Sequence, residues 1–169
     1  MQSARLTYRN MCVQDADELF KLTNDYETAY WCGWTRDLTV SDTRRRIAHD
    51  WGLRPYWFLI IRKCDGEIIG CISLDERKVD SYEIGYFLGK NYRGKGYMME
   101  AIDAISSFAF DILGANILWC GYFDGNERSR IVQTKCGFIP HHVEPNAYVG
   151  AYNETRKEFV TIKRRKEDI

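Results

Sequence analysis

The sequence predicts an α/β protein, a single domain over residues 1–169 with a mixed sheet of about six to seven strands and about four helices. Three features predict this class. Strand-like apolar runs occupy much of residues 56–88, apolar residues with a helical period follow over residues 98–112, and another strand-like run begins at Asn116. A strand that follows another strand by way of a helix is expected to lie parallel to it, with a right-handed crossover.

The N-terminal third is expected to contain one strand and two helices. Apolar and polar residues alternate over residues 5–9, as in a strand with one buried face. Asp15 is a candidate N-cap of a first helix, and Thr39 or Ser41 is a candidate N-cap of a second. The faces expected to be buried carry Leu19, Phe20 and Thr23 in the first helix and Ile47, Ala48 and Trp51 in the second.

The middle of the chain is expected to form three strands, over residues 56–63, 67–74 and 81–88. Asp65-Gly66 stands between the first two, and this pair strongly favours a hairpin turn. A long helix should follow, since apolar residues recur there at spacings of three and four. Its apolar face is expected to hold Met98, Ala101, Ile102, Ile105, Phe108, Ala109 and Ile112.

The last third is expected to complete the sheet. Gly114 can end the long helix, and residues 116–123 then form a strand. A short helix should follow over residues 126–136, and two antiparallel strands near Tyr148 and Val160 should close the sheet.

The composition is that of a folded protein without a dominant charge. The 24 basic and 24 acidic residues cancel, so no overall field favours nucleic acid or an anionic membrane as a partner. The first residues lack the pattern of a signal peptide, and no apolar run is long enough to cross a bilayer. The six cysteines form no CxxC pair. We therefore expect a cytoplasmic protein with reduced thiols, either a monomer or a homodimer.

A glycine-rich turn, Arg93-Gly94-Lys95-Gly96, lies between a strand and the start of the long helix. The first N–H groups of a helix have no intrahelical acceptor, and the helix dipole adds about half a positive charge there. Gly94 and Gly96 let the backbone bend and approach a ligand closely. The turn is therefore a candidate phosphate or pyrophosphate site, although glycine can also serve a tight turn for steric reasons alone.

Two common phosphate motifs do not fit this turn. A Walker A loop requires Ser or Thr after Gly-Lys, whereas Asn91 follows one such pair and Gly96 follows the other. A dinucleotide fingerprint requires a third glycine where this chain has Met99. A nucleotide-binding protein is thus a weaker alternative.

Two longer runs resemble the Gcn5-related N-acetyltransferase (GNAT) superfamily. They are EIGYFLGKNYRGKGYMMEA, residues 83–101, and NERSRIVQTKCGF, residues 126–138, and they are most similar to the RimJ/RimL-type branch of ribosomal-protein N-terminal acetyltransferases. The family's Gln/Arg-x-x-Gly-x-Gly/Ala signature is matched at Arg93 and Gly96, while its last position holds Met98. The second element, Asn-x-x-Ser/Ala followed by Gly-Phe, is matched by Asn126, Ser129, Gly137 and Phe138.

This resemblance implies acetyl-CoA as co-substrate, held where two central parallel strands splay apart. The pyrophosphate would lie on the amides of residues 93–98, the pantetheine arm would pair with backbone near Phe87 and Leu88, and Asn126 would hydrogen-bond that arm. The residues assigned to acetyl-CoA are Phe87, Leu88, Arg93, Gly94, Lys95, Gly96, Tyr97, Met98, Asn126 and Ser129. The acceptor amine would attack the thioester directly, without a covalent enzyme intermediate, and backbone N–H groups would stabilise the oxyanion.

The resemblance also suggests an acid and leaves the base open. Many superfamily members use a tyrosine as acid where this chain has Gln133, which cannot act as one. In the terminal-acetyltransferase branch the serine is a candidate, so Ser129 is predicted to protonate or hydrogen-bond the leaving thiolate. It could instead bond only to nearby backbone. Glu83 is the first candidate base and Asp75 the second, although Glu83 could simply pair with a cation.

The predicted acceptor is a primary amine, either a protein N-terminus or a small amine. The neutral amine is the form that attacks, and at pH 7 about one α-amine in ten is neutral but only about one lysine in two thousand. A weak base is therefore sufficient for an α-amine. The acceptor pocket could be lined by Tyr26, Tyr30, Trp31 and Trp34, which could equally be core or a dimer surface.

The missing tyrosine leaves a second class of function open, a CoA-binding sensor that transfers nothing. No metal is expected, because the adjacent His141 and His142 should point to opposite faces of a strand.

Overall fold

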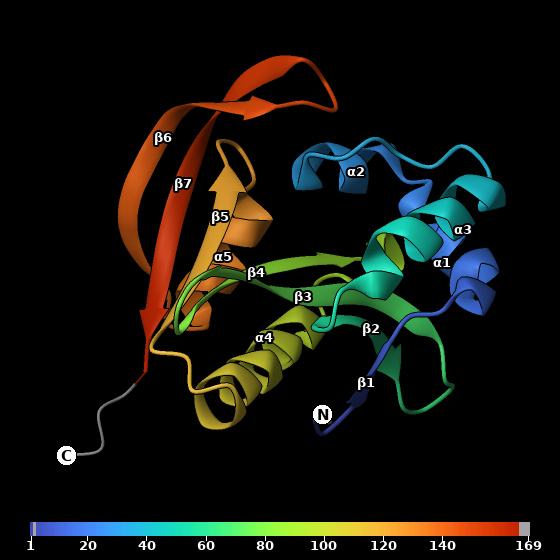
Figure 1. The fold of residues 1–169 in the computed structure, drawn as a ribbon, viewed down its shortest axis with the longest axis horizontal. Coiled ribbons are helices and arrows are strands. Elements are labelled where there is room, and N and C mark those ends of the chain that lie inside the picture. Colours follow the sequence, from blue (N-terminus) through green and yellow to red (C-terminus); the bar gives the residue numbers. More distant parts are fainter. Residues whose placement is uncertain (2, 166–169) are drawn as a thin grey trace.

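The computed structural model describes residue 1 and residues 3–165. They form a seven-stranded sheet with helices on both faces (Figure 1). The strands are Leu6–Asn10 (β1), Trp57–Arg62 (β2), Ile68–Lys78 (β3), Ser81–Leu88 (β4), Ile117–Phe123 (β5), Ile139–Val149 (β6) and Glu154–Arg164 (β7). The α-helices are Ala16–Thr23 (α1), Tyr26–Cys32 (α2), Val40–His49 (α3), Tyr97–Ser107 (α4) and Glu127–Lys135 (α5).

The sheet contains strands of both directions, as predicted. Its order is β1-β2-β3-β4-β5-β7-β6, and only β4 and β5 are parallel neighbours. Their pairing begins at Ser81 with Ile117 and ends at Glu83 with Trp119, although β4 continues to Leu88. The two strands therefore part beyond Glu83 and Trp119, which confirms the expected splay of the central parallel strands.

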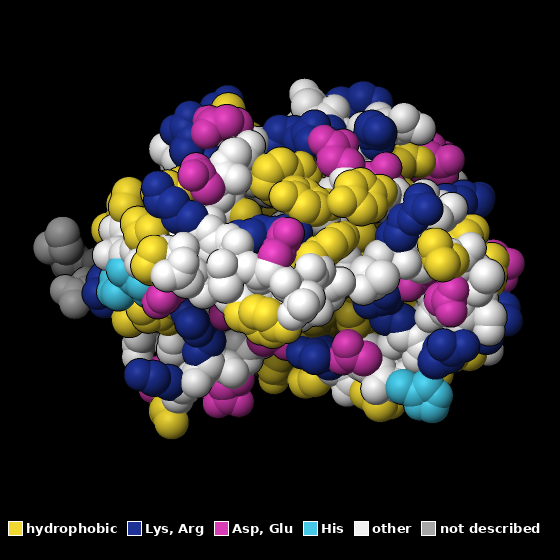
Figure 2. Space-filling view, turned by 90° about the horizontal axis from the view of Figure 1, so that it is seen from above, with side chains coloured by type: hydrophobic (Ala, Val, Ile, Leu, Met, Phe, Trp, Pro, Cys, Tyr) yellow, Lys and Arg dark blue, Asp and Glu magenta, His cyan; other side chains and the backbone are white. Residues whose placement is uncertain are grey.

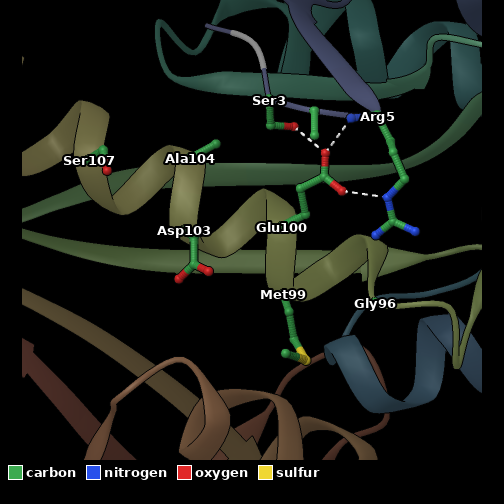
Figure 3. A pocket seen from close by; sticks show the side chains of 9 residues that line it. Ser3, Arg5, Gly96, Met99, Glu100, Asp103, Ala104 and Ser107 are labelled. Atoms are coloured by element: carbon green, nitrogen blue, oxygen red, sulfur yellow. Dashed lines mark hydrogen bonds and ion pairs between the residues drawn. The ribbon is translucent and has the colours of Figure 1, made fainter.

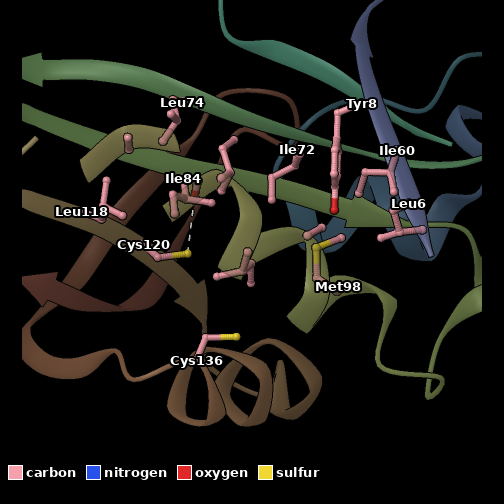
Figure 4. Close-up of a cluster of buried hydrophobic side chains, with 14 of the residues drawn as sticks. Leu6, Tyr8, Ile60, Ile72, Leu74, Ile84, Met98, Leu118, Cys120 and Cys136 are labelled. Carbon is pink, nitrogen blue, oxygen red and sulfur yellow. Dashed lines mark hydrogen bonds between the residues drawn. The ribbon is translucent and has the colours of Figure 1, made fainter. Parts of the chain in front are cut away.

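Two hydrophobic clusters hold the layers together. The first lies between the sheet and the layer of α4 and α5 and includes Ile84, Ile102 and Leu118 (Figure 4). The second packs α1 and α3 against the opposite face and includes Leu19 and Phe87. Along β4, Ile84 and Leu88 therefore face α4, whereas Phe87 faces the α1–α3 side. The two faces of the splay are thus covered by different helices.

The face of the long helix that was predicted to be buried is correct up to the segment where the helix changes type. Met98, Ala101, Ile102, Ile105 and Ala109 are buried. Ile112, expected inside, is 71% exposed. The chain changes from α-helix to π-helix over Phe108–Ile112, and the wider turn shifts later residues out of the α-helical period. Phe20 and Ala48, also expected inside, are only half-buried.

Replacing Ile102 with alanine should lower the free energy of unfolding by about 2–5 kcal/mol, because it leaves a cavity beneath α4. Ile112→Ala is the matched control and should cost far less, since its side chain is already in solvent. Urea titrations of both variants measure the difference. Equal losses would contradict the observed orientation of the segment after Phe108.

One helix, α2, was not predicted from the sequence. The side chain of Asp25 caps it by accepting a hydrogen bond from the amide nitrogen of Thr28 at 2.8 Å. Gly33 ends it with a left-handed conformation, φ 74°. Its short, aromatic-rich sequence has no amphipathic period, so only the capping residues marked it. The described chain therefore has five α-helices where about four were expected.

Helix capping agrees with prediction for α3 and differs for α1. Thr39 caps α3, since its hydroxyl accepts from the amide of Asp42 at 3.2 Å. Asp15 precedes α1, but its side chain makes no capping bond to that helix. Its carboxylate binds the guanidinium of Arg9 at 2.6 and 2.8 Å and accepts from the amide of Cys12. Asp15 therefore ties the start of α1 to β1.

Candidate active site

The turn between β4 and α4 presents a run of backbone N–H groups without acceptors. Gly94 and Gly96 have φ of 75° and 78°, a region that favours glycine. Within the described part of the chain, no group accepts a hydrogen bond from the amides of residues 94–99. Glu100 is the first with an acceptor, the carbonyl of Gly96 at 3.1 Å. These amides lie at and just before the N-terminus of α4, where an anion is favoured.

The side chain of Arg93 does not serve this anion site directly. Its guanidinium donates to the carbonyl of Leu88 (3.1 Å), the carboxylate of Glu27 (2.9 Å) and the hydroxyl of Thr28 (2.8 Å). The positive charge of Arg93 is therefore paired with Glu27 of α2. Arg93 instead fastens the turn to α2.

Glu27 joins three parts of the site. Its carboxylate pairs with Arg93 of the turn and with Arg128 at the start of α5. The guanidinium of Arg128, followed by that of Arg93, holds the pKa of Glu27 below its usual range. Lys95 is the cation that stays available, since its ammonium donates only to the carbonyl of Asn91 at 3.0 Å.

A groove lies beside the turn, where side chains of α4 bind the N-terminal segment. It is lined by Ser3, Ala4, Arg5, Gly96, Met99, Glu100, Asp103, Ala104 and Ser107. Figure 3 shows Ser3 and Arg5 directed at Glu100 from one side, while Met99 points away. The carboxylate of Glu100 accepts from the hydroxyl of Ser3 (2.7 Å) and from the amide and Nε of Arg5 (2.6 and 2.8 Å). Its acceptors are thus occupied by protein.

Beyond Glu83, one edge of β4 has no strand beside it. The carbonyls of Tyr86 and Leu88 accept only from side chains on this edge, the thiol of Cys32 (3.8 Å) and the guanidinium of Arg93 (3.1 Å). An extended ligand can therefore lie along this edge like an added strand. Phe87 and Leu88, the residues predicted to meet the pantetheine arm, stand at its end.

A network of hydrogen-bonded side chains lies on the α5 side of the splay between β4 and β5. The hydroxyls of Tyr86 and Ser129 are 2.6 Å apart. The Nε2 of Gln133 donates to both, at 3.2 and 3.1 Å, and its Oε1 accepts from Thr161 at 2.8 Å. Burial raises the pKa of Tyr86 well above its usual range, so the phenol keeps its proton at neutral pH. The hydroxyl of Ser129 thus bonds to side chains and not merely to nearby backbone.

Sequence reasoning missed Tyr86. Gln133 occupies the family's tyrosine position, but β4 brings a phenol to within 3.2 Å of its side-chain nitrogen. No local pattern marks this, because the contact joins residues of two distant elements. Asn126 is the N-cap of α5, and its Oδ1 accepts from the amide of Ser129 at 3.2 Å. Its Nδ2 donates to no described group and stays available to a ligand.

The two predicted bases are both held by cations. The carboxylate of Glu83 is 3.3 Å from Nε of Arg77. Asp75 accepts from Arg54 at 2.8 Å and from the indole of Trp57 at 3.0 Å. Each carboxylate therefore has a structural role whatever else it does.

The aromatic residues predicted to meet the acceptor divide into two groups. Trp34 packs against Trp51 and Phe87, with ring centroids 5.7 Å apart in both pairs, and belongs to the second core cluster. Tyr26, Tyr30 and Trp31 of α2 form an aromatic cluster with Tyr152, which follows β6. Figure 2 shows hydrophobic side chains gathered across the middle of the face that carries α2.

Arg156 of β7 joins the aromatic cluster to the sheet. Its guanidinium lies 3.8 Å from the ring centroid of Tyr30 and 5.1 Å from that of Phe123 in β5. It also donates to the carbonyl of Tyr30 at 2.5 Å. The cluster therefore continues from α2 onto the α1–α3 face of β5 and β7.

The residues described here include no group of three or more His, Cys, Asp or Glu side chains placed to hold a metal ion. The expectation that His141 and His142 point apart is wrong, since their Nδ1 atoms are 2.7 Å apart. The register of β6 against β7 shifts between Pro140 and His142, which breaks the alternation of side chains there. None of the described helices has the length and apolar sequence needed to span a membrane.

Comparisons with known proteins found similarity in both sequence and structure. The family described as acetyltransferase (GNAT) domain matches residues 5–139. The chain is 31% identical to the putative ribosomal N-acetyltransferase YdaF of Bacillus subtilis over 143 residues, 79% of this chain and 78% of the relative.

Solved structures share the fold over nearly the whole chain. An acetyltransferase of the GNAT family from Bacillus anthracis superposes with a TM-score of 0.88 at 22% identity, covering 99% of both chains. Spermidine N-acetyltransferase from Vibrio cholerae, in complex with CoA and spermine, superposes with a TM-score of 0.78 at 16% identity, covering 95% of both chains.

Proposed function

The chain belongs to the GNAT acetyltransferase family, and on this premise we propose that it transfers an acetyl group from acetyl-CoA to a primary amine. The observation that carries the proposal is the run of unpaired amides at residues 94–99, placed beside an open strand edge. Pyrophosphate and an extended amide-containing arm are the two chemistries that these features recognise. We propose one transferase domain over residues 1–169.

For acetyl-CoA, the amides of residues 94–98 would hold the pyrophosphate and Lys95 would add positive charge. The pantetheine arm would lie along β4 near Phe87 and Leu88, with the Nδ2 of Asn126 as a donor. The protein of the same fold that holds CoA supports this choice of ligand. The thioester would then lie in the splay between β4 and β5.

The chemistry is proposed to be direct attack of the amine on the thioester carbonyl. Ser129 would donate a hydrogen bond to the sulfur as the C–S bond breaks, and Tyr86 would donate to Ser129 in turn. A protonated phenol with a raised pKa suits a donor that keeps its own proton. This phenol also weakens the sensor alternative, which was based on the missing tyrosine at Gln133.

The acceptor is proposed to approach from the α1–α3 side, past the aromatic cluster. Glu83 would add negative charge at the point where the strands part. A relative named as a ribosomal acetyltransferase supports a protein N-terminus and membership of the RimJ/RimL-type branch. The spermine-bound structure supports a small amine as the second candidate.

A thiol-release assay tests the proposal. Purified protein and acetyl-CoA are combined with N-terminal peptides, lysine peptides, polyamines, amino acids and aminoglycosides, and products are identified by mass. We expect acceptor-dependent release of CoA with acetylation of an amine nitrogen. Binding of acetyl-CoA by calorimetry without transfer to any acceptor would favour the sensor alternative.

A further inference from the structure

Glu158 of β7 has an unusual position beside the splay. It is the cross-strand partner of Phe123, and its carboxylate lies over Gly121 of β5. A Cβ atom at Gly121 would overlap the carboxylate oxygen. The glycine thus leaves the space that this acid occupies. Gly121 is two residues beyond Trp119, the last residue of β5 that pairs with β4.

The carboxylate of Glu158 is half-buried and has no partner. Among the described residues, no group donates a hydrogen bond to it and no cation lies within ion-pair distance. Glu83 and Asp75 differ, because each is bound by an arginine. Burial, and then the charge of Glu83, raise the pKa of Glu158. Burying an acid without a counterion costs stability. Acids perturbed in this way are found preferentially at functional sites.

Glu158 also lies on the face that an acceptor would reach. Trp119 and Gly121 share one face of β5, whereas Cys120 points to the opposite, α5 side. The partner residue Phe123 lies beside Arg156 of the aromatic cluster. An amine that passes the cluster would therefore meet Glu158 on the opposite side of the splay from Ser129.

We propose that Glu158 is the general base of the transfer reaction, taking a proton from the nitrogen of a primary amine acceptor. The inference rests on the proposed function. The amine nitrogen forms a bond to the carbonyl carbon, the C–S bond breaks, and one proton passes from nitrogen to the carboxylate of Glu158. The sulfur leaves as a thiolate, accepts a hydrogen bond from Ser129, and takes a proton from solvent.

The charged groups around Glu158 determine its pH dependence. Glu83 of β4 and Glu144 of β6 raise its pKa, and Arg77 of β3 and His142 of β6 oppose them. The base must be ionised, so activity falls as pH drops through its pKa. The acid limb of kcat/KM should therefore lie above the ordinary range of a glutamate, about 4.3.

Glu158→Gln is the direct test, measured with the acceptor identified by the panel. We expect kcat/KM for the amine at pH 7 to fall about 100-fold. The acid limb that belongs to the enzyme should disappear, so that only ionisation of the amine itself remains. Acetyl-CoA affinity by calorimetry should stay within about twofold. Glu144→Gln is the matched control, since Glu144 is the cross-strand partner of Glu158 on β6 but is exposed. It should keep nearly native kcat/KM at pH 7, and its acid limb should move to lower pH, because Glu144 raises the pKa of Glu158.

Thermal unfolding separates a catalytic role from a structural one. A raised pKa in the folded state means that stability is lost as pH rises through it, so removing the charge should restore stability. Glu158→Gln should therefore melt higher than the native protein at pH 7, and this gain should vanish at acid pH. A purely structural glutamate would give the opposite shift.

Glu158→Asp is the second variant. It keeps a carboxylate but withdraws it by one methylene, so kcat/KM should fall about tenfold while the acid limb remains. Native kcat/KM in Glu158→Gln, or loss of the limb in Glu158→Asp, would overturn the inference and leave the proposed function intact. A native protein that binds acetyl-CoA and acetylates nothing would overturn both.

Discussion

Replacing Gly96 with aspartate should weaken acetyl-CoA binding by at least about 100-fold, or about 2.7 kcal/mol. The residue has φ 78°, where a side chain costs roughly 1–2 kcal/mol. The new carboxylate would stand among the amides of residues 94–99 and repel a pyrophosphate. Calorimetric titration with acetyl-CoA measures the effect.

A second glycine supplies the control. Gly114 has φ 71°, and a Cβ added there would meet no atom within 4 Å. Gly114→Asp therefore carries comparable backbone strain at the far end of the same helical segment, away from the turn. It should keep native affinity for acetyl-CoA. If Gly96→Asp also bound normally, the pyrophosphate could not lie on this turn.

Elements of the fold were predictable where the sequence of the element itself carries the pattern. β4 has the bounds that its strand-like run of residues predicted, Ser81–Leu88, because the local sequence alone carries that signal. The π-helix after Phe108 was not predictable, since its apolar spacing looks α-helical. α2 was missed for a related reason, because its aromatic residues carry no helical period.

The part of the candidate site that depends on backbone conformation was predictable from the sequence. Glycine spacing indicated a tight turn at Gly94 and Gly96, and the structure gives both glycines positive φ. The partners of Arg93 were not predictable, because Glu27 lies 66 residues away in the chain. Tyr86 and Glu158 were not predicted for the same reason. The proposed role of each depends on contacts with residues of another strand or helix.

Removing the hydroxyl of Ser129 should lower kcat about 100-fold while the KM for acetyl-CoA changes little. In the proposed reaction this hydroxyl bonds the sulfur mainly as charge develops on it, so its loss affects the transition state more than the bound substrate. Steady-state kinetics of Ser129→Ala with the identified acceptor measure the split. An unchanged kcat would remove Ser129 from the chemistry.

The partnership of Ser129 with Tyr86 makes a sharper prediction. Tyr86→Phe removes the hydroxyl that lies 2.6 Å from that of Ser129 and should lower kcat about tenfold. Because Tyr86 is proposed to act through Ser129, adding Tyr86→Phe to Ser129→Ala should cost little more. Tyr82→Phe is the matched control, since Tyr82 is a β4 tyrosine whose hydroxyl bonds to no described group.

The size of this coupling distinguishes two mechanisms. A double variant no slower than Ser129→Ala means that the phenol orients and polarises the serine. Fully additive losses mean that Tyr86 reaches the sulfur independently of Ser129. The buried amide of Gln133 favours the first result, because it donates to both hydroxyls and holds them together. Strong coupling would thus identify a serine–tyrosine pair beside Gln133, the position at which the resemblance implies a tyrosine.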